Sequence, residues 1–193
     1  MPDLNLAVIG NSIVAALVDR RGRIVWYCLP RLDGDPIFGS LLNGDDPADG
    51  FFEVSLEHHV SSTQQYLENT AVLATTLTDA QDAAVRITDF VPRFKRYDRI
   101  FRPAMLVRRI EPIRGLPMVR IRLRPMFGYG GARPSRTLGS NHLRYVTTGM
   151  ALRLTTDAPI AYIESEAAFA LTAPVTLFLG PDEPLTDSIT QLS

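Results

Sequence analysis

Cysteine is almost absent from this sequence, because Cys28 is the only one among 193 residues. A single thiol excludes an internal disulfide and also excludes Cys-rich zinc sites, whose partner thiols are missing. Histidine is scarce as well, with three residues in the chain. His58 and His59 are neighbours, and neighbouring strand positions point to opposite faces, while His142 stands alone. We therefore expect no metal site and no cofactor.

Long apolar runs and an excess of charge of one sign are also lacking. No stretch of 18 apolar residues occurs, so the sequence predicts no transmembrane helix. Residues 1–5 carry no basic group ahead of the first apolar stretch, which argues against a secretory signal and makes the cytoplasm the expected location. Twenty basic and 21 acidic residues give a net charge of −1, which disfavours a nucleic-acid binder. We expect neither nucleic acid nor membrane as a partner.

What the sequence does contain is a succession of short apolar segments bounded by turn residues. Residues 13–18 and 24–29 flank a turn in which Gly22 would supply a positive φ, which predicts a β-hairpin. Residues 71–78 and 84–91 flank a second connection of hairpin length. The other expected strands are residues 51–56, 105–110, 142–147, 150–155, 160–164, 168–172 and 175–179.

Helical periodicity is nearly missing, with one turn at most around Leu41 and Leu42. About twelve strands with short connections and little helix predict an all-β fold, either two packed, mainly antiparallel sheets or a closed barrel.

Residues 119–124, Val-Arg-Ile-Arg-Leu-Arg, show the clearest alternation. A period of two residues puts three arginines on one face of a strand and three aliphatic side chains on the other. One interpretation is a stripe that binds anions or a partner protein. The other is a solvated outer face whose charges are neutralised by acids on neighbouring strands, and the even charge balance of the chain favours this second interpretation.

Two long irregular stretches, residues 30–50 and 127–139, interrupt the strands. Loops of this length in a compact domain are usually functional or packed against another element. From residue 181 onward the composition becomes polar and proline-punctuated, as in a linker. We expect a β-sandwich domain over residues 1–180 and a linker over residues 181–193 that leads to a second domain.

Residues 26–39, which run into the first of these loops, are the densest mixture of aromatic, charged and turn-forming residues in the chain. Trp26, the only tryptophan, precedes Arg31, Asp33 and Phe38, and Tyr129 lies in the glycine-rich second loop. Aromatic rings stack on the C–H faces of sugars while Arg and Asp bind hydroxyl groups, so this set suits a saccharide. The alternative is a tryptophan that anchors the core, with Arg31 and Asp33 paired to hold the loop.

Two pairs of closely spaced carboxylates, Asp33 with Asp35 and Glu164 with Glu166, raise the question of catalysis. Glycosidases hold their two carboxyl groups about 5–5.5 Å apart when retaining and about 6.5–9.5 Å apart when inverting, and neighbouring loop residues satisfy either distance. Nothing else marks one of these groups as a general acid. We predict no catalytic residue in this chain.

Several motifs taken together resemble the bacterial and archaeal proteins of glycoside hydrolase family 15. The opening of those proteins is similar to Ile-Gly-Asn at 9–11, Ala-Ala-Leu-Val-Asp at 15–19, Gly-Arg-Ile-Val-Trp at 22–26 and Leu-Pro-Arg-Leu-Asp at 29–33. Their downstream motifs are similar to Tyr66 with residues 70–75, to Thr-Asp-Phe-Val-Pro at 88–92 and to Arg-Arg at 108–109. The resemblance runs through essentially the whole chain in order.

That resemblance implies an N-terminal super-β-sandwich joined by a linker to an α/α six-hairpin barrel that holds both catalytic glutamates. Members include glucoamylase-like and trehalase-like enzymes that hydrolyse α-glucosides with inversion. The expected partner of this chain is that barrel, and the expected substrate is an α-glucoside bound through it. The expected residues at the substrate rim or the interdomain contact are Trp26, Arg31, Asp33, Phe38 and Tyr129.

Departures from the family motifs, at Leu32, at residues 34–36 and at residues 125–130, leave the substrate of such an enzyme open. The alternative function is an independent carbohydrate-binding module, which predicts that Trp26 or Tyr129 is exposed on a flat or grooved surface.

Overall fold

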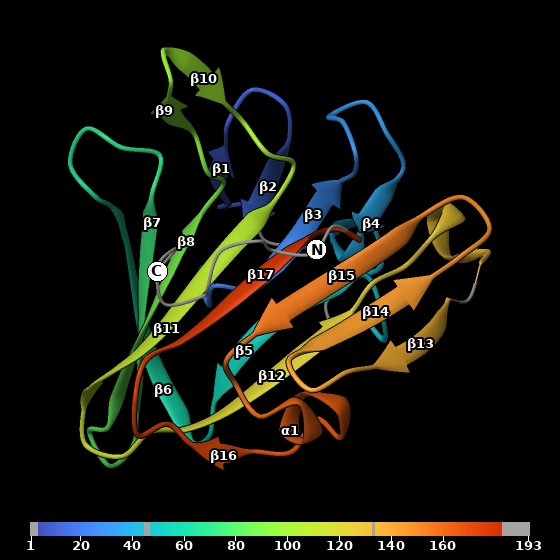
Figure 1. Cartoon of the computed structure of the whole chain (residues 1–193). Helices are drawn as coiled ribbons and strands as arrows, with labels where there is room; N and C mark the ends of the chain where they lie inside the picture. Colours follow the sequence, from blue (N-terminus) through green and yellow to red (C-terminus); the bar gives the residue numbers. More distant parts are fainter. Residues whose placement is uncertain (1–3, 45–46, 133, 183–193) are drawn as a thin grey trace.

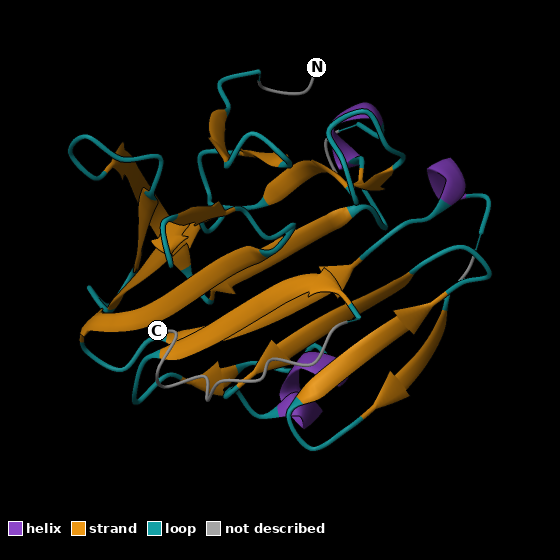
Figure 2. Ribbon diagram, turned by 45° about the horizontal axis from the view of Figure 1, so that its top comes forward, coloured by secondary structure: helices purple, strands orange, loops and turns teal. Residues whose placement is uncertain are grey.

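The short alternating segments form two antiparallel sheets that pack face to face, which confirms the predicted sandwich (Figure 1). The computed structural model describes residues 4–44, 47–132 and 134–182. Helix is confined to short turns at the margins of the sheets (Figure 2). Most of the expected linker, residues 183–193, lies outside the described residues, and the last strand ends at Pro181.

The first sheet has seven strands. Its order is β1 (Ala7–Gly10), β2 (Ala15–Val18), β3 (Ile24–Cys28), β5 (Phe51–Leu56), β12 (Met118–Arg124) and β16 (Phe169–Ala170), with β4 (Pro36–Phe38) paired to β3.

The second sheet has eight strands. Its order is β13 (Ser135–Leu138), β14 (His142–Val146), β15 (Ala151–Thr156), β17 (Val175–Pro181), β11 (Leu106–Arg114), β8 (Ala84–Phe90), β7 (Leu73–Asp79) and β6 (His59–Tyr66). A separate hairpin, β9 (Phe94–Arg96) with β10 (Arg99–Phe101), projects beyond both sheets at the top of Figure 1.

The two predicted hairpins are closed by the same device, an aspartate at the first turn position. Oδ1 of Asp19 accepts hydrogen bonds of 2.9 Å from the backbone N–H groups two and four residues further on. Oδ1 of Asp79 accepts two equivalent bonds of 2.8 Å. The residue three places after each aspartate has a positive φ, +75° at Gly22 and +66° at Asp82. An Asx-type turn followed by a left-handed residue returns the chain as a hairpin, which explains both connections.

The arginine stripe lies on β12 as the alternation predicts. The aliphatic residues of β12 are buried in the core, and each of the three arginines pairs with a glutamate. The donor–acceptor distances are 3.2 Å for Arg120–Glu57, 2.7 Å for Arg122–Glu53 and 2.8 Å for Arg124–Glu166. These pairs support the interpretation of a neutralised outer face over that of an anion-binding stripe.

One expected strand is wrong. Residues 160–164 form α1 (Ile160–Glu164), with Pro159 at the N-cap. A five-residue apolar run does not distinguish a strand from a helical turn by its periodicity. Proline directly before the run favours a helix start, and the turn buries Ile163 while the Tyr162 ring packs against Phe169 at 5.3 Å. The single turn expected at Leu41 and Leu42 is confirmed as the 3₁₀ helix η1 (Ser40–Leu42).

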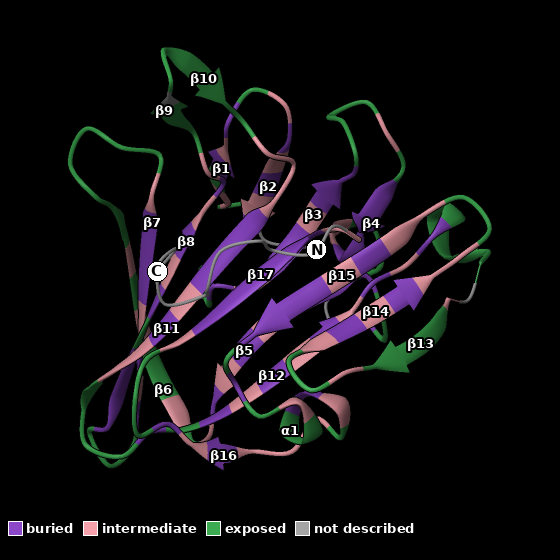
Figure 3. Cartoon of the chain, viewed as in Figure 1, coloured by how far each residue is buried: buried purple, intermediate pink, exposed green. Residues whose placement is uncertain are grey.

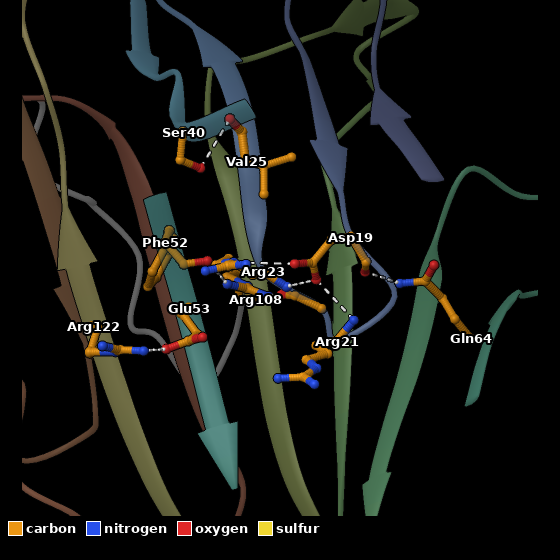
Figure 4. Close-up of polar contacts among 11 residues, drawn as sticks. Asp19, Arg21, Arg23, Val25, Ser40, Phe52, Glu53, Gln64, Arg108 and Arg122 are labelled. Atoms are coloured by element: carbon orange, nitrogen blue, oxygen red, sulfur yellow. Dashed lines mark hydrogen bonds and ion pairs between the residues drawn. The ribbon is translucent and has the colours of Figure 1, made fainter. Parts of the chain in front are cut away.

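A fully buried ion pair joins the two sheets. Arg108 of β11 and Asp89 of β8 lie opposite each other in the second sheet, both side chains 0% exposed. Nε and Nη2 of Arg108 donate to the two carboxylate oxygens of Asp89 at 2.7 and 3.1 Å. Across the core, Nη1 donates to the carbonyl oxygen of Phe52 in β5 at 2.8 Å, and Nη2 also donates to the carbonyl oxygen of Gly22 (Figure 4).

Burial raises the pKa of the Asp89 carboxyl group, and the Arg108 guanidinium opposes that rise. The guanidinium also lies 4.8 Å from the centroid of the Phe52 ring, a cation–π distance. A charge is tolerated in a core only when it is paired and hydrogen-bonded, and Arg108 meets both conditions.

We expect Arg108→Ala to lower the free energy of unfolding by about 3–5 kcal/mol, because it leaves the Asp89 carboxyl group buried without its partner. Arg120→Ala breaks a partly exposed pair on the outer face and should cost about 1 kcal/mol or less. Urea unfolding of both variants checks the difference. Equal losses would show that the buried pair has no special role.

Candidate functional site

The loops that carry the candidate residues lie at one end of the sandwich. The pairing of Ala16 with Tyr27 brings the loop after β3 to the same end as the β1–β2 connection. The antiparallel pairing of β5 with β12 brings the chain after Arg124 to this end as well. We call this the loop end, and it comprises residues 11–14, 29–35 and 126–131 together with the projecting β9–β10 hairpin.

The two lateral edges of the sandwich differ: hydrogen bonds join the two sheets at one edge, and a pocket lies at the other. On one side the hydroxyl group of Tyr66, in β6, donates to the carbonyl oxygen of Val8 at 2.9 Å and accepts from its N–H at 2.8 Å. On the other side a pocket of about 720 Å³ lies between the end of β12 and the strands β13 and β14. Its lining includes Arg124, Met126, Tyr129, Arg136, Tyr145 and Glu166.

Tyr129 stands at this pocket with 64% of its surface exposed. It belongs to η2 (Gly128–Gly130), where three consecutive residues have positive φ values of +54°, +52° and +89°. Two of the three are glycines, which adopt this conformation without a steric cost, and the result is one tight turn. The turn presents the tyrosine ring outward, as the carbohydrate-binding alternative requires of an exposed aromatic residue.

Two of the charged residues that line the pocket, Arg124 and Glu166, are paired with each other. Nε and Nη2 of Arg124 donate to the two carboxylate oxygens of Glu166 at 2.8 and 2.6 Å. This double hydrogen bond lowers the pKa of Glu166 and raises the pKa of Arg124. Arg136, which also lines the pocket, forms an ion pair with Glu164 at 3.4 Å. A glycosidase needs one carboxyl group with a raised pKa as its general acid, and Glu166 is shifted in the opposite direction.

The loop after β3 carries a second exposed pair. Nε and Nη2 of Arg31 donate to the two carboxylate oxygens of Asp33 at 2.9 and 3.0 Å, with about 70% of each side chain exposed (73% and 71%). The N–H of Gly34 closes the turn on the carbonyl oxygen of Arg31 at 3.1 Å. In this conformation the two side chains hold each other, which is the loop-holding arrangement considered from the sequence.

Trp26 and Phe38 lie on opposite faces of the first sheet. Phe38 is 0% exposed because its pairing with Tyr27 turns it into the core, where its ring lies 6.1 Å from those of Tyr27 and Phe52. Trp26, one position before Tyr27, is half-buried on the outer face. Of the five candidates, the structure brings only Arg31 and Asp33 into contact with each other, and it leaves Phe38 without access to a ligand.

No metal centre or membrane helix is found in the part of the chain that the structure describes. His58 occupies a turn with φ +53°, and His59 begins β6. Among the described residues, no three His, Cys, Asp or Glu side chains gather to hold a metal ion. None of the helices among these residues is long and apolar enough to cross a membrane.

Comparison with known proteins connects this architecture to one group of enzymes. A model of the family described as trehalase-like, N-terminal, matches residues 4–173. A trehalase of Thermoplasma volcanium is 29% identical over 154 residues, which cover 79% of this chain and 24% of that protein. Trehalase 1 of Sulfolobus acidocaldarius is 34% identical over 129 residues, 67% of this chain and 20% of that protein. The chain therefore spans about a quarter or less of the length of these relatives.

The Arg124–Glu166 pair makes the stability of the domain depend on pH. The pKa of Glu166 is lower in the folded state than in the unfolded chain. The pair therefore stabilises the fold fully at pH values above the ordinary glutamate pKa of about 4.3, and this contribution is lost as the pH falls through the folded-state pKa. We expect Glu166→Gln to lower the free energy of unfolding by up to about 1 kcal/mol at pH 7. The difference from the unaltered chain should shrink on acidification.

Denaturant unfolding at several pH values measures this effect, and Glu68→Gln, at an exposed position, is the control. A loss of stability in the Glu166 variant that is the same at pH 7 and pH 3 would contradict the assigned direction of the pKa shift.

Proposed function

We propose, because the chain belongs to the family of trehalase-like N-terminal domains, that it is the non-catalytic β-sandwich domain of an inverting α-glucoside hydrolase of glycoside hydrolase family 15. In this proposal the loop end of the sandwich docks on an α/α six-hairpin barrel in the same polypeptide. The barrel supplies both catalytic glutamates and binds the substrate, a glucoside of the trehalose or maltose type. The cytoplasm stays the predicted location.

The observation that carries the proposal is the family match over residues 4–173 combined with the length of the relatives. Proteins named trehalase contain a segment similar to this chain in 24% or less of their length, so most of each relative lies outside the matched segment. The carboxylates that the sequence singled out agree with a role without catalysis. Asp33 and Glu166 each accept two hydrogen bonds from an arginine.

Within this proposal the pocket and its exposed tyrosine would extend the rim of the substrate site. Tyr129 lies at the loop end, on a tight turn, and lines the same pocket as the paired side chains of Arg124 and Glu166. An exposed aromatic ring over a polar hollow can stack on the C–H face of a glucose unit while the polar groups meet its hydroxyls. Arg31 and Asp33, on the neighbouring loop, would then contact the barrel itself.

We expect the purified chain to hydrolyse neither trehalose nor maltose, because it holds no general acid and no free catalytic carboxylate pair in its described part. The full-length polypeptide should hydrolyse one of the two sugars, and deletion of residues 1–180 from it should lower its thermal stability or its yield of folded enzyme. Glucose release and thermal unfolding are the measurements. Turnover by the isolated chain, or an equally stable and active enzyme without it, would contradict the proposed function.

We expect Tyr129→Gly to leave the unfolding free energy within about 0.5 kcal/mol of the unaltered chain, since the side chain is exposed and its φ of +52° suits glycine. Phe38→Ala should cost about 3–5 kcal/mol because the ring is buried. If Tyr129 forms part of the rim, its replacement raises KM of the full-length enzyme several-fold at unchanged kcat.

Calorimetric titration of the isolated chain with trehalose separates the two functions. No heat is expected from a docking domain. Heat that disappears with Tyr129→Gly would favour an independent carbohydrate-binding module instead.

A further inference from the structure

The projecting hairpin is built as a unit apart from both sheets. Its strands β9 and β10 pair with each other, with Arg99 opposite Arg96 and Phe101 opposite Phe94. Neither strand pairs with a described strand of the two large sheets. Tyr97 and Asp98 connect them with φ values of +49° and +56°. Two consecutive positive φ values are the mark of the two-residue hairpin turn. We call residues 93–102 the basic arm.

The basic arm exposes its apolar side chains. Tyr97 is 83% exposed, Ile100 is 57% exposed, and Phe94 and Phe101 are about half exposed (48% and 40%). The two phenylalanine rings stack at 5.7 Å with 13° between their planes. Figure 3 shows the arm as an exposed extension of a sandwich whose central strands are buried. An isolated two-stranded hairpin is at best marginally stable in water, and clustered exposed aromatic residues are typical of a binding surface.

The charge of the arm is opposite to that of the rest of the chain. Residues 93–102 contain five basic residues and one acidic residue, a net charge of +4 in a chain whose net charge is −1, so the remaining residues carry −5. Lys95 pairs with Asp98 at 2.8 Å. Arg93, Arg99 and Arg102 make no ion pair with the described residues. Free guanidinium groups beside aromatic rings fit a partner surface rich in carboxylates.

One buried side chain holds both ends of the arm. Nδ2 of Asn11 donates to the carbonyl oxygens of Pro92 and Pro103, both at 2.9 Å. Its Oδ1 accepts from the N–H groups of Ile13 at 3.0 Å and Val14 at 3.3 Å. Asn11 is 3% exposed and uses both of its amide protons and its oxygen, so the arm leaves the sandwich from a fixed base. A binding element held in place before it meets its partner loses less entropy on binding.

The last described strand ends beside this base. Leu179 of β17 pairs with Leu106, the first residue of β11, four residues after the arm. At Gly180 a β-carbon would lie 3.1 Å from the carbonyl oxygen of Ala104, so the two chain segments are in close contact there. The last described strand therefore ends close to the base of the arm.

We propose that the basic arm is the element through which this domain binds the hydrolase domain of the same polypeptide. Tyr97, Ile100 and the stacked phenylalanine rings enter an apolar recess on that domain, and Arg99 and Arg102 pair with Asp and Glu side chains at its margin. This inference rests on the proposed function, which supplies the partner, and adds the surface and its chemistry. The net charge of −5 on the rest of the chain disfavours a nucleic acid or an anionic membrane as the occupant.

The test uses the full-length polypeptide with a protease site introduced after residue 182. The arm variant combines Tyr97→Gly, Ile100→Ser and Arg99→Glu. The matched control combines Val60→Ser, on the exposed edge strand β6, with Arg21→Glu, in the β2–β3 turn at the far end of β2 from Asn11. After cleavage, size-exclusion chromatography and calorimetry report whether the two halves stay together.

We expect the halves of the unaltered protein and of the control to co-elute, and those of the arm variant to separate with a Kd raised at least tenfold. Circular dichroism of the separated sandwich shows that it is still folded. If the arm variant stays associated like the control, the arm is not the contact, while the proposed function stands.

Two further outcomes overturn the proposal. If the halves of the unaltered protein separate on cleavage, or if no hydrolase domain follows, the proposed function fails and the arm proposal fails with it. If all halves stay associated but the unaltered protein binds heparin or vesicles containing phosphatidylserine and the arm variant does not, the occupant is an anionic polymer or lipid surface.

Discussion

The contact between the two sheets depends on the buried pair of Arg108 and Asp89. Strand alternation turns both residues inward, where an unpaired charge would be prohibitive. Arg108 resolves this by binding Asp89 within its own sheet and the carbonyl oxygens of Phe52 and Gly22 in the other layer. These directional bonds specify how the second sheet sits over β5 and the β2–β3 turn. Apolar packing alone would not favour this one alignment so strongly.

The sequence predicts the elements that carry a local signal, and it misses those that depend on distant pairing. Both aspartate-closed hairpins and the alternation of β12 were predictable because turn chemistry and a period of two residues lie within the segments themselves. The strand predicted at residues 160–164 is wrong because five residues do not establish a period. The polar edge strand β6 has no apolar face, and its role follows from its pairing with β7.

The candidate site was predictable in part for the same reason. The Arg31–Asp33 pair and the exposed turn at Tyr129 follow from loop composition. The inward position of Phe38 depends on the pairing of β4 with β3, which the sequence does not specify. The sequence carries a local signal for the basic arm as well: aromatic and basic residues are concentrated between Pro92 and Pro103, with a net charge opposite to that of the chain.

The motifs by which this chain resembles its family hold the framework of the domain. Asp89 and Arg108, from two separate motifs, form the buried pair, and Asn11, from the opening motif, holds the base of the arm. These structural roles show that a match over residues 4–173 rests in part on residues that hold the fold. These residues hold the loop end in position, and β17 ends there as well. Since the same asparagine closes the β1–β2 connection and holds the arm, loss of its amide would alter the direction of the arm before it altered the core.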